Sequence, residues 1–175
     1  VQVLALLAQA IAEHEQRADN TGFAPFLVVA PTSVVGNWAQ EAARFVPGAK
    51  VVTITESTSK SGKSIAELVQ GAHLVLTSYA LFRLDEDGYT EFGNHVPENA
   101  EKSTSPHAGW GALILDEAQF VKNTKTRAWK VARALNAQVK LAITGTPMEN
   151  NLMELWALLA IVADGLFPSA RMFRD

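Results

Sequence analysis

The sequence predicts an α/β fold in which a mainly parallel sheet is covered by helices on both faces. Short runs rich in apolar or β-branched residues recur along the chain, and stretches with helical periodicity separate them. The runs are continuous rather than alternating, which is typical of strands buried on both faces. The expected strands are 26–30, 50–55, 73–76, 112–115 and 140–143. At 175 residues the chain has the length of one ordinary domain.

The composition is that of a globular domain. Hydrophobic residues make up 48% and charged residues 19%, which excludes a disordered chain. The net charge of -3 shows no overall basic excess, so DNA binding would need a local basic strip or another domain. The absence of cysteine excludes disulfides and thiolate metal sites. The four histidines lack metal-ligand spacing, and no apolar run approaches the ~20 residues that cross a bilayer.

The first expected helix covers residues 1 to about 17. Leu4, Leu7 and Ile11 follow one another at helical spacing. A helix usually starts with a capping side chain, because its first amides have no partner within the helix. Since this pattern is already under way at Val1, we expect the natural start of the helix to lie upstream.

Further helices are expected over 35–45, 64–70, 128–135 and 152–162. Ser64 and Glu67 have the spacing of a capping box, and Gly71 follows the end of that helix. The tryptophans at 38, 129 and 156 lie on or beside apolar helix faces and are expected in the core.

The segment 85–109 has a different composition from the rest of the chain. Glu, Asp, Asn, Ser, Pro and Gly dominate it, which predicts a mobile surface loop or an insertion. No internal repeat and no second domain is visible in the sequence.

The most informative motif is the pair Asp116-Glu117 directly after the apolar run 112–115. A buried parallel strand delivers such a pair to the carboxyl edge of the sheet, where open α/β folds bind ligands. Asp116 can hold a magnesium ion, and Glu117 can orient and deprotonate an attacking water. A strand that merely ends in two acids before a helix is the alternative, and the motif alone leaves both open.

Three other strand ends carry small polar residues. Thr144-Gly145-Thr146 follows one strand, and a loop of this kind can sense a phosphate at the neighbouring strand tip. Pro31-Thr32-Ser33 and Thr77-Ser78 close two further strands, where hydroxyls and free amides suit phosphate oxygens. A plain turn and ordinary helix capping are the alternatives for these motifs.

Together, the order and spacing of four strings resemble the Swi/Snf-type ATPases of helicase superfamily two. The strings are LVVAPTSVVGNWAQE (motif Ia), LVLTSYALFR (motif Ib), LILDEAQFVKN (motif II) and LAITGTPMENNLMELWALL (motif III). The resemblance covers nearly the whole chain apart from the polar stretch after Asp85. It implies a three-layer RecA-like lobe of the P-loop NTPase class, the N-terminal one of two, truncated before its first helix. Many members read DEAH or DEGH at motif II, and DEAQ is a variant that leans towards bacterial members.

The resemblance also implies roles for single residues. Asp116 would coordinate magnesium together with ATP, and Glu117 would activate water. Gln119 would link the ATP site to motif III, where Thr144, Gly145 and Thr146 would carry that link. The residues implied to contact DNA are Pro31, Thr32, Ser33, Thr77, Ser78, Lys122 and Asn123. For Lys122, a solvated loop before a helix remains the alternative.

A segment that nearly spells a P-loop lies elsewhere. Residues 57–64 read S-T-S-K-S-G-K-S, but the pattern requires glycine where Ser57 stands. Capping explains Ser64, and the family's P-loop precedes motif Ia, so we expect no nucleotide site here. No Walker A motif is therefore expected in this chain, since Gly-Lys-Thr would lie just before Val1.

The resemblance implies an ATP-dependent translocase on double-stranded DNA that remodels protein–DNA complexes, with ATP and magnesium as cofactors. The second RecA-like lobe of the parent chain would be a partner, and no membrane is implied. The fragment alone is expected to be inactive. Alternatives are a strand-separating or restriction-type helicase, a non-catalytic interaction module, and a small nucleotide kinase using Gly62, Lys63 and Ser64. The location implied is the bacterial cytoplasm, at the nucleoid, or the nucleus in a eukaryote.

Overall fold

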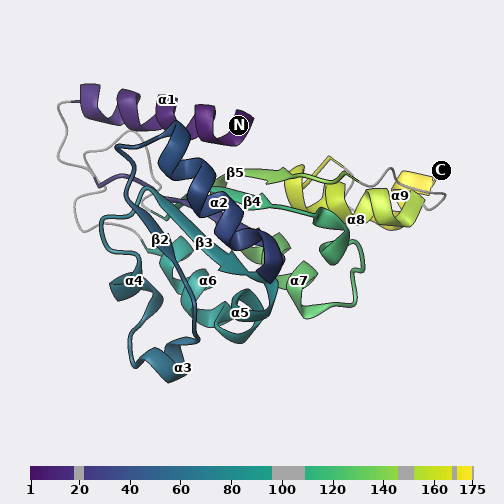
Figure 1. Ribbon diagram of the computed structural model, residues 1–175. Coiled ribbons are helices and arrows are strands. Elements are labelled where there is room, and N and C mark those ends of the chain that lie inside the picture. The colour runs from purple at the N-terminus through teal and green to yellow at the C-terminus, as the bar shows by residue number, and fades with distance from the viewer. Residues whose placement is uncertain (18–21, 96–108, 146–151, 167–168, 175) are drawn as a thin grey trace.

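The computed structural model describes residues 1–17, 22–95, 109–145, 152–166 and 169–174. Within them, one five-stranded sheet has the order β2-β3-β1-β4-β5, and every neighbouring pair is parallel (Figure 1). The strands are β1 (Phe26–Ala30), β2 (Val51–Thr53), β3 (Leu74–Ser78), β4 (Trp110–Leu115) and β5 (Ala137–Ala142).

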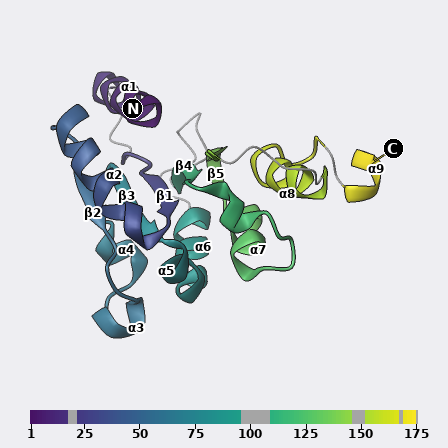
Figure 2. The same cartoon turned by 45° about the vertical axis from the view of Figure 1, so that its right-hand side comes forward.

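Helices cover both faces of this sheet. On one face lie α1 (Gln2–Gln16) and α2 (Thr32–Phe45). The opposite face packs against α4 (Ile65–Leu68), α5 (Tyr79–Leu84), α6 (Glu86–Asn94) and α7 (Arg127–Ala134). Beyond β5, α8 (Leu152–Val162) packs against α7, and α9 (Ala170–Arg174) follows it (Figure 2). The predicted α/β fold with a parallel sheet and helices on both faces is confirmed.

The central strand shows why the strands read as continuous apolar runs. Along β1, Leu27 and Val29 belong to the core cluster under α5, α6 and α7, whereas Phe26 and Val28 belong to the cluster under α1 and α2. Burial against helices on both sides removes the alternation that marks a half-exposed strand. None of the described helices combines the length and apolarity needed to span a membrane.

The expected strands and helices are confirmed with shifts of a few residues. The largest shifts, of three residues, are at the start of α2, at Thr32 rather than Val35, and at the start of β5, at Ala137 rather than Lys140. The predicted capping box is present: Ser64 Oγ accepts from the Glu67 amide at 3.2 Å, and Glu67 Oε2 accepts from the Ser64 amide at 2.7 Å.

The expectation of a loop over 85–109 is wrong for its first part. Residues Glu86–Asn94 form α6, and residues 96–108 lie outside the described residues. The polar composition hides a buried side: Tyr89 is fully buried and donates its hydroxyl proton to Thr77 Oγ1 at 3.0 Å. A Cβ added at Gly93 would lie 2.9 Å from the Asn136 carbonyl oxygen, so close backbone packing requires glycine there.

Candidate functional site

The carboxyl ends of β4 and β5 lie side by side, and the candidate site is built on them. The pairing continues past both strands. The Ile143 amide donates to the Leu115 carbonyl at 2.8 Å, and the Ala118 amide donates to the Ile143 carbonyl at 2.8 Å. The segment that carries Asp116 therefore runs directly beside the one that carries Thr144.

Asp116 is held from several parts of the fold. Its amide donates to the Val29 carbonyl of β1 at 2.9 Å. Its carboxylate accepts two hydrogen bonds, at Oδ1 from the Glu117 amide (2.9 Å) and at Oδ2 from Trp38 Nε1 (2.8 Å). The carbonyl oxygen of Asp116 accepts from the Tyr79 hydroxyl at 2.6 Å. The main chain and both carboxylate oxygens of this residue are thus fixed in direction.

The pKa of the Tyr79 hydroxyl, which donates to the Asp116 carbonyl, is raised well above 10.0. Burial is the main cause, and the negative charges of Asp116 and Glu117 add to it. Its ring also stacks on Phe120 with centroids 5.2 Å apart. The start of α5 is therefore attached to the turn that follows β4.

Glu117, Gln119 and Thr144 form a hydrogen-bonded chain. Gln119 Nε2 donates to Glu117 Oε2 at 2.6 Å, and Thr144 Oγ1 donates to Gln119 Oε1 at 3.2 Å. The structure thus brings together most of the residues expected to couple motif II to motif III. Gly145 follows and is exposed, whereas Thr146 lies outside the described residues.

The backbone of Glu117 is in the left-handed region, with φ 49° and ψ 56°. Among the described residues it is the only non-glycine residue with positive φ. Such a conformation costs of order 1–3 kcal/mol and persists where the surrounding structure imposes it, often at functional sites. Here it turns the chain sharply between β4 and the 3₁₀ turn Ala118–Val121.

A cleft of about 600 Å³ opens beside Asp116. The start of α1, Trp38 and the end of β5 line it; the lining residues are Val1, Gln2, Val3, Leu6, Trp38, Asp116, Leu141, Ala142 and Ile143. Val1 stands at the N-cap position of α1, and its apolar side chain cannot accept a hydrogen bond from the first amides of this helix.

Asp116 fits the requirements of magnesium. Mg²⁺ prefers hard oxygen ligands and is usually bound through one or two carboxylates plus substrate phosphates and water. Within the described ranges, no group of three or more His, Cys, Asp or Glu side chains could form a complete metal cage. A single cleft-facing carboxylate therefore suits an ion that arrives with its substrate.

The two loops expected to contact DNA differ in how they expose their side chains. Pro31 precedes α2, and Thr32 and Ser33 are exposed in its first turn. The expectation for the Thr77 side chain is wrong, because it is fully buried and accepts from the Tyr89 hydroxyl. Ser78 is also buried, and its hydroxyl caps α5 by accepting from the Leu81 amide at 3.2 Å. The first loop therefore exposes side chains, whereas Thr77 and Ser78 expose almost no surface.

Lys122 and Asn123 lie in the turn before α7. Lys122 Nζ pairs with Glu154 of α8 at 3.1 Å, and both side chains are partly exposed. Asn123 Oδ1 accepts from the Lys125 amide at 2.9 Å and so shapes the turn. The structure gives each residue a local role and keeps Lys122 at the surface.

Residues 57–64 do not form a phosphate loop. Thr58 donates its amide and hydroxyl to Asp85 at 3.0 and 2.6 Å. The amides of Lys60 and Ser61 donate to the Ser57 carbonyl, and the Gly62 amide donates to the Thr58 carbonyl. Amides that would have to face a phosphate are thus used within the short helix α3 (Thr58–Ser61).

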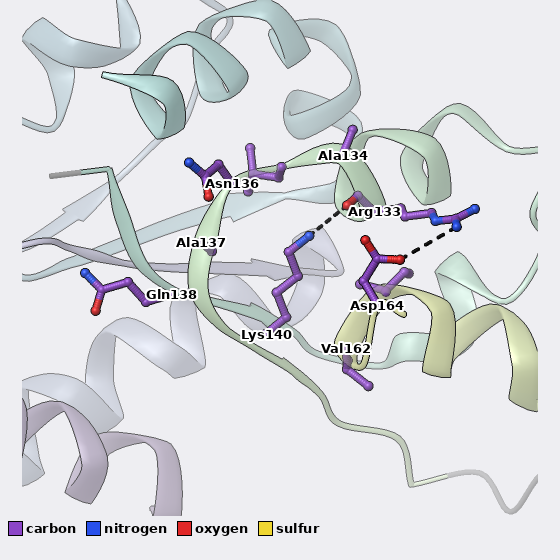
Figure 3. Close-up of a pocket in the computed structure, with 10 residues that line it drawn as sticks. Arg133, Ala134, Asn136, Ala137, Gln138, Lys140, Val162 and Asp164 are labelled. Carbon is purple, nitrogen blue, oxygen red and sulfur yellow. Dashed lines mark hydrogen bonds and ion pairs between the residues drawn. The ribbon is translucent and has the colours of Figure 1, made fainter. Parts of the chain in front are cut away.

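A second hollow, of about 420 Å³, lies at the amino end of β5 (Figure 3). There Lys140 Nζ donates to the carbonyls of Ala132 and Arg133 at 3.0 and 2.8 Å and so caps the C-terminal end of α7. Arg133 pairs with Asp164 at 3.7 Å. Burial lowers the pKa of Lys140, with the nearby charge of Asp164 opposing this shift.

Sequence reasoning missed two residues of the site. Trp38 was expected in the core, and Tyr79 was given no role, yet both donate hydrogen bonds to Asp116. Each lies within a string that carries the family resemblance, Trp38 in motif Ia and Tyr79 in motif Ib. A polar atom on an otherwise apolar side chain, inside a motif, is the signal that could have found them.

Comparisons with known proteins agree with this geometry. The SNF2-related domain family matches residues 1–175. The chromatin-remodeling ATPase INO80 of Arabidopsis thaliana is 33% identical over 100% of this chain and 11% of its own length. The helicase swr1 of Schizosaccharomyces pombe is 35% identical over 91% of this chain and 11% of its own.

Among solved structures, the Sulfolobus solfataricus SWI2/SNF2 ATPase core in complex with dsDNA superposes with a TM-score of 0.72. It is 27% identical and covers 99% of this chain and 31% of the other. This chain spans about a tenth of the length of the two curated relatives, INO80 and swr1. The parallel sheet, the Asp116-Glu117 turn and the match along the whole length agree, and the chain belongs to the SNF2-related domain family of Swi/Snf-type ATPases.

Proposed function

We propose that the chain is the first motor lobe of an ATP-dependent translocase on double-stranded DNA that remodels protein–DNA complexes. The hydrogen-bonded chain Glu117–Gln119–Thr144 beside the carboxylate of Asp116, at the mouth of a cleft, carries the proposal. The relatives support it, since one is named a chromatin-remodeling ATPase and another is an ATPase core in complex with dsDNA.

In this mechanism the chain provides the acidic half of the ATP site. Asp116 would hold magnesium, which when bound neutralises charge on the phosphate oxygens. Glu117 orients the attacking water and accepts its proton. Gln119 holds the Glu117 carboxylate from one side and accepts from Thr144 on the other. A shift of the loop after β5 would therefore move the base.

The other half of the ATP site is proposed to come from elsewhere in the complete protein. The 175 residues contain no G-x-x-x-x-G-K-[ST] motif, the pattern that holds the β- and γ-phosphates. Since the relatives are about eight to nine times as long as this chain, room exists for that loop and for a second RecA-like lobe. We therefore expect the 175-residue chain alone to have no ATPase activity.

DNA is proposed to contact the carboxyl edge near the starts of α2 and α5. The exposed hydroxyls of Thr32 and Ser33, beside Pro31, would meet phosphates of one strand. The surface turn at Lys122 and Asn123 would extend this track. The net charge of -3 means that other parts of the protein supply most of the basic surface.

The test is an ATPase assay of the complete protein with and without double-stranded DNA, together with displacement of a third strand from a DNA triplex. We expect DNA to stimulate hydrolysis and the triplex strand to be released without separation of the duplex. Strand separation would favour the helicase alternative. No DNA stimulation, or full ATPase activity of the 175-residue chain alone, would contradict the proposal.

A further inference from the structure

We infer that Trp38 is a positioning residue for Asp116, and that its indole N–H fixes the carboxylate in the orientation that binds magnesium. The inference rests on the proposed function and deepens it. Trp38 Nε1 donates to Asp116 Oδ2 at 2.8 Å, across 78 positions of sequence. Both residues line the same cleft.

The two oxygens of Asp116 are restrained by donors of different origin. Oδ1 accepts from the amide of the next residue, Glu117, and this donor moves with the same turn. Oδ2 accepts from a ring anchored on another element, α2. The bond between the Cβ and carboxyl carbons of aspartate rotates over a broad range. The Trp38 contact therefore ties the direction of the carboxylate to the body of the domain rather than to the turn alone.

The ring of Trp38 is well placed for this task. It is partly buried and packs against the core cluster under α1 and α2. An indole has a large apolar body and one N–H donor, so packing holds the ring while the donor points at its partner. It brings no charge that would compete with a cation near Asp116. Groups that hydrogen-bond a metal-ligating carboxylate typically change metal affinity by about 10–100-fold when they are removed.

The experiment is a magnesium titration of the complete protein with two changes at position 38. Trp38→Phe removes the donor and part of the ring. Replacement of the indole by its benzothiophene isostere keeps the shape and removes only the N–H. The first readout is the magnesium concentration that half-saturates DNA-stimulated ATPase activity. The second, which needs no catalysis, is the rise in melting temperature with magnesium at fixed ADP.

Trp129→Phe is the matched control. Its indole donates to the Ala157 carbonyl at 2.7 Å in the buried interface between α7 and α8, away from the cleft. Both phenylalanine variants lose one indole hydrogen bond and some packing, so both are expected to lower the melting temperature without magnesium. Only the changes at position 38 are expected to raise the half-saturating magnesium concentration, by about tenfold.

A folded isostere variant with the magnesium response of the wild type would overturn the inference, as would an equal shift in Trp129→Phe. If Trp38→Phe does not fold, the isostere decides the question. A wild-type protein without magnesium-dependent ATPase activity would instead overturn the proposed function, and the inference with it. A wild-type protein that is active while the isostere is unaffected removes only the role of Trp38.

Discussion

The neighbouring strands β4 and β5 have polar groups at both ends, and these groups have different partners. At the amino end of β5, the Lys140 ammonium donates to two carbonyls in the last turn of α7 (Figure 3). At the carboxyl end, the Asp116 carboxylate faces a cleft and is held in place by donors from α2 and from its own turn.

The groups at the amino end support the fold, whereas those at the carboxyl end belong to the proposed ATP site. The donors at the amino end satisfy helix carbonyls, so their removal should weaken the fold and leave activity intact. The carboxyl end contains a left-handed glutamate, a conformation that costs stability and is often found at functional sites, and a carboxylate held by Trp38 from another element. The predictions that follow divide along this line.

The largest effect is expected from Glu117→Gln in the complete protein. The amide keeps an oxygen that can accept from Gln119 but cannot take a proton from water. The DNA-stimulated ATPase rate should fall about 100-fold or more, while the melting temperature stays close to that of the wild type. The control is Glu56→Gln, a partly exposed residue that pairs with Lys60 at the surface. A large drop in the control, or none in Glu117→Gln, would remove the contrast between the two ends.

The next effect is expected from Lys140→Met. The substitution leaves two carbonyls of α7 without their donor, and the free energy of unfolding should fall by roughly 1–3 kcal/mol. The ATPase rate of the folded protein should not change. Urea unfolding measures the loss, and Lys130→Met, an exposed position of the same helix, is the matched control. Lower activity at full stability would contradict the structural role of the amino end.

Alkaline pH is expected to have a smaller effect on stability, which involves Tyr79 at the carboxyl end and Lys140 at the amino end. Burial raises the pKa values of Tyr79 and Tyr89 above 10.0. Above about pH 10 these phenols ionise when the chain unfolds but stay protonated in the fold, so stability is lost as pH rises. The slope should approach about 1.4 kcal/mol per pH unit for each tyrosine. Tyr79→Phe should remove about half of this loss.

Lys140 acts in the opposite sense in the same experiment. Its lowered pKa means that the unfolded chain binds more protons just below pH 10.5, so its contribution to stability increases as pH rises. Urea unfolding of Tyr79→Phe in the Lys140→Met background, at about pH 8 and about pH 11, isolates the tyrosine contribution. An unchanged alkaline loss in that double variant would show that Tyr79 is not protected from ionisation.

The smallest effect is expected from Lys63→Ala. The amides of residues 60–62 are already hydrogen-bonded within this segment, and Thr58 is bonded to Asp85. Nucleotide binding by the complete protein should therefore not change. Equilibrium binding of a fluorescent ATP analogue measures this. Weaker binding would revive the kinase-like interpretation of residues 57–64.

The fold was largely predictable because the three central strands β1, β3 and β4 are short and buried on both faces, and continuous apolar runs mark such strands well. The capping box at Ser64 and Glu67 was predictable because its chemistry is local. Helix α6 was not, since the apolar residues that dock it, such as Tyr89, are diluted among polar ones. The directions of Thr77 and Trp38 depend on neighbours far along the chain, and no local pattern reveals them.

The attachments of Asp116 have a consequence for how the domain assembles. Its two side-chain donors outside its own turn lie 37 and 78 positions earlier in the chain. The ligand geometry therefore exists only after β1, β3 and β4 have docked with their helices. In a partly folded lobe the Asp116 carboxylate is not yet held in this orientation. A ligand that binds the oriented carboxylate therefore stabilises the completed sheet. Protection of these strands from hydrogen exchange should rise together on ligand binding, as one cooperative unit.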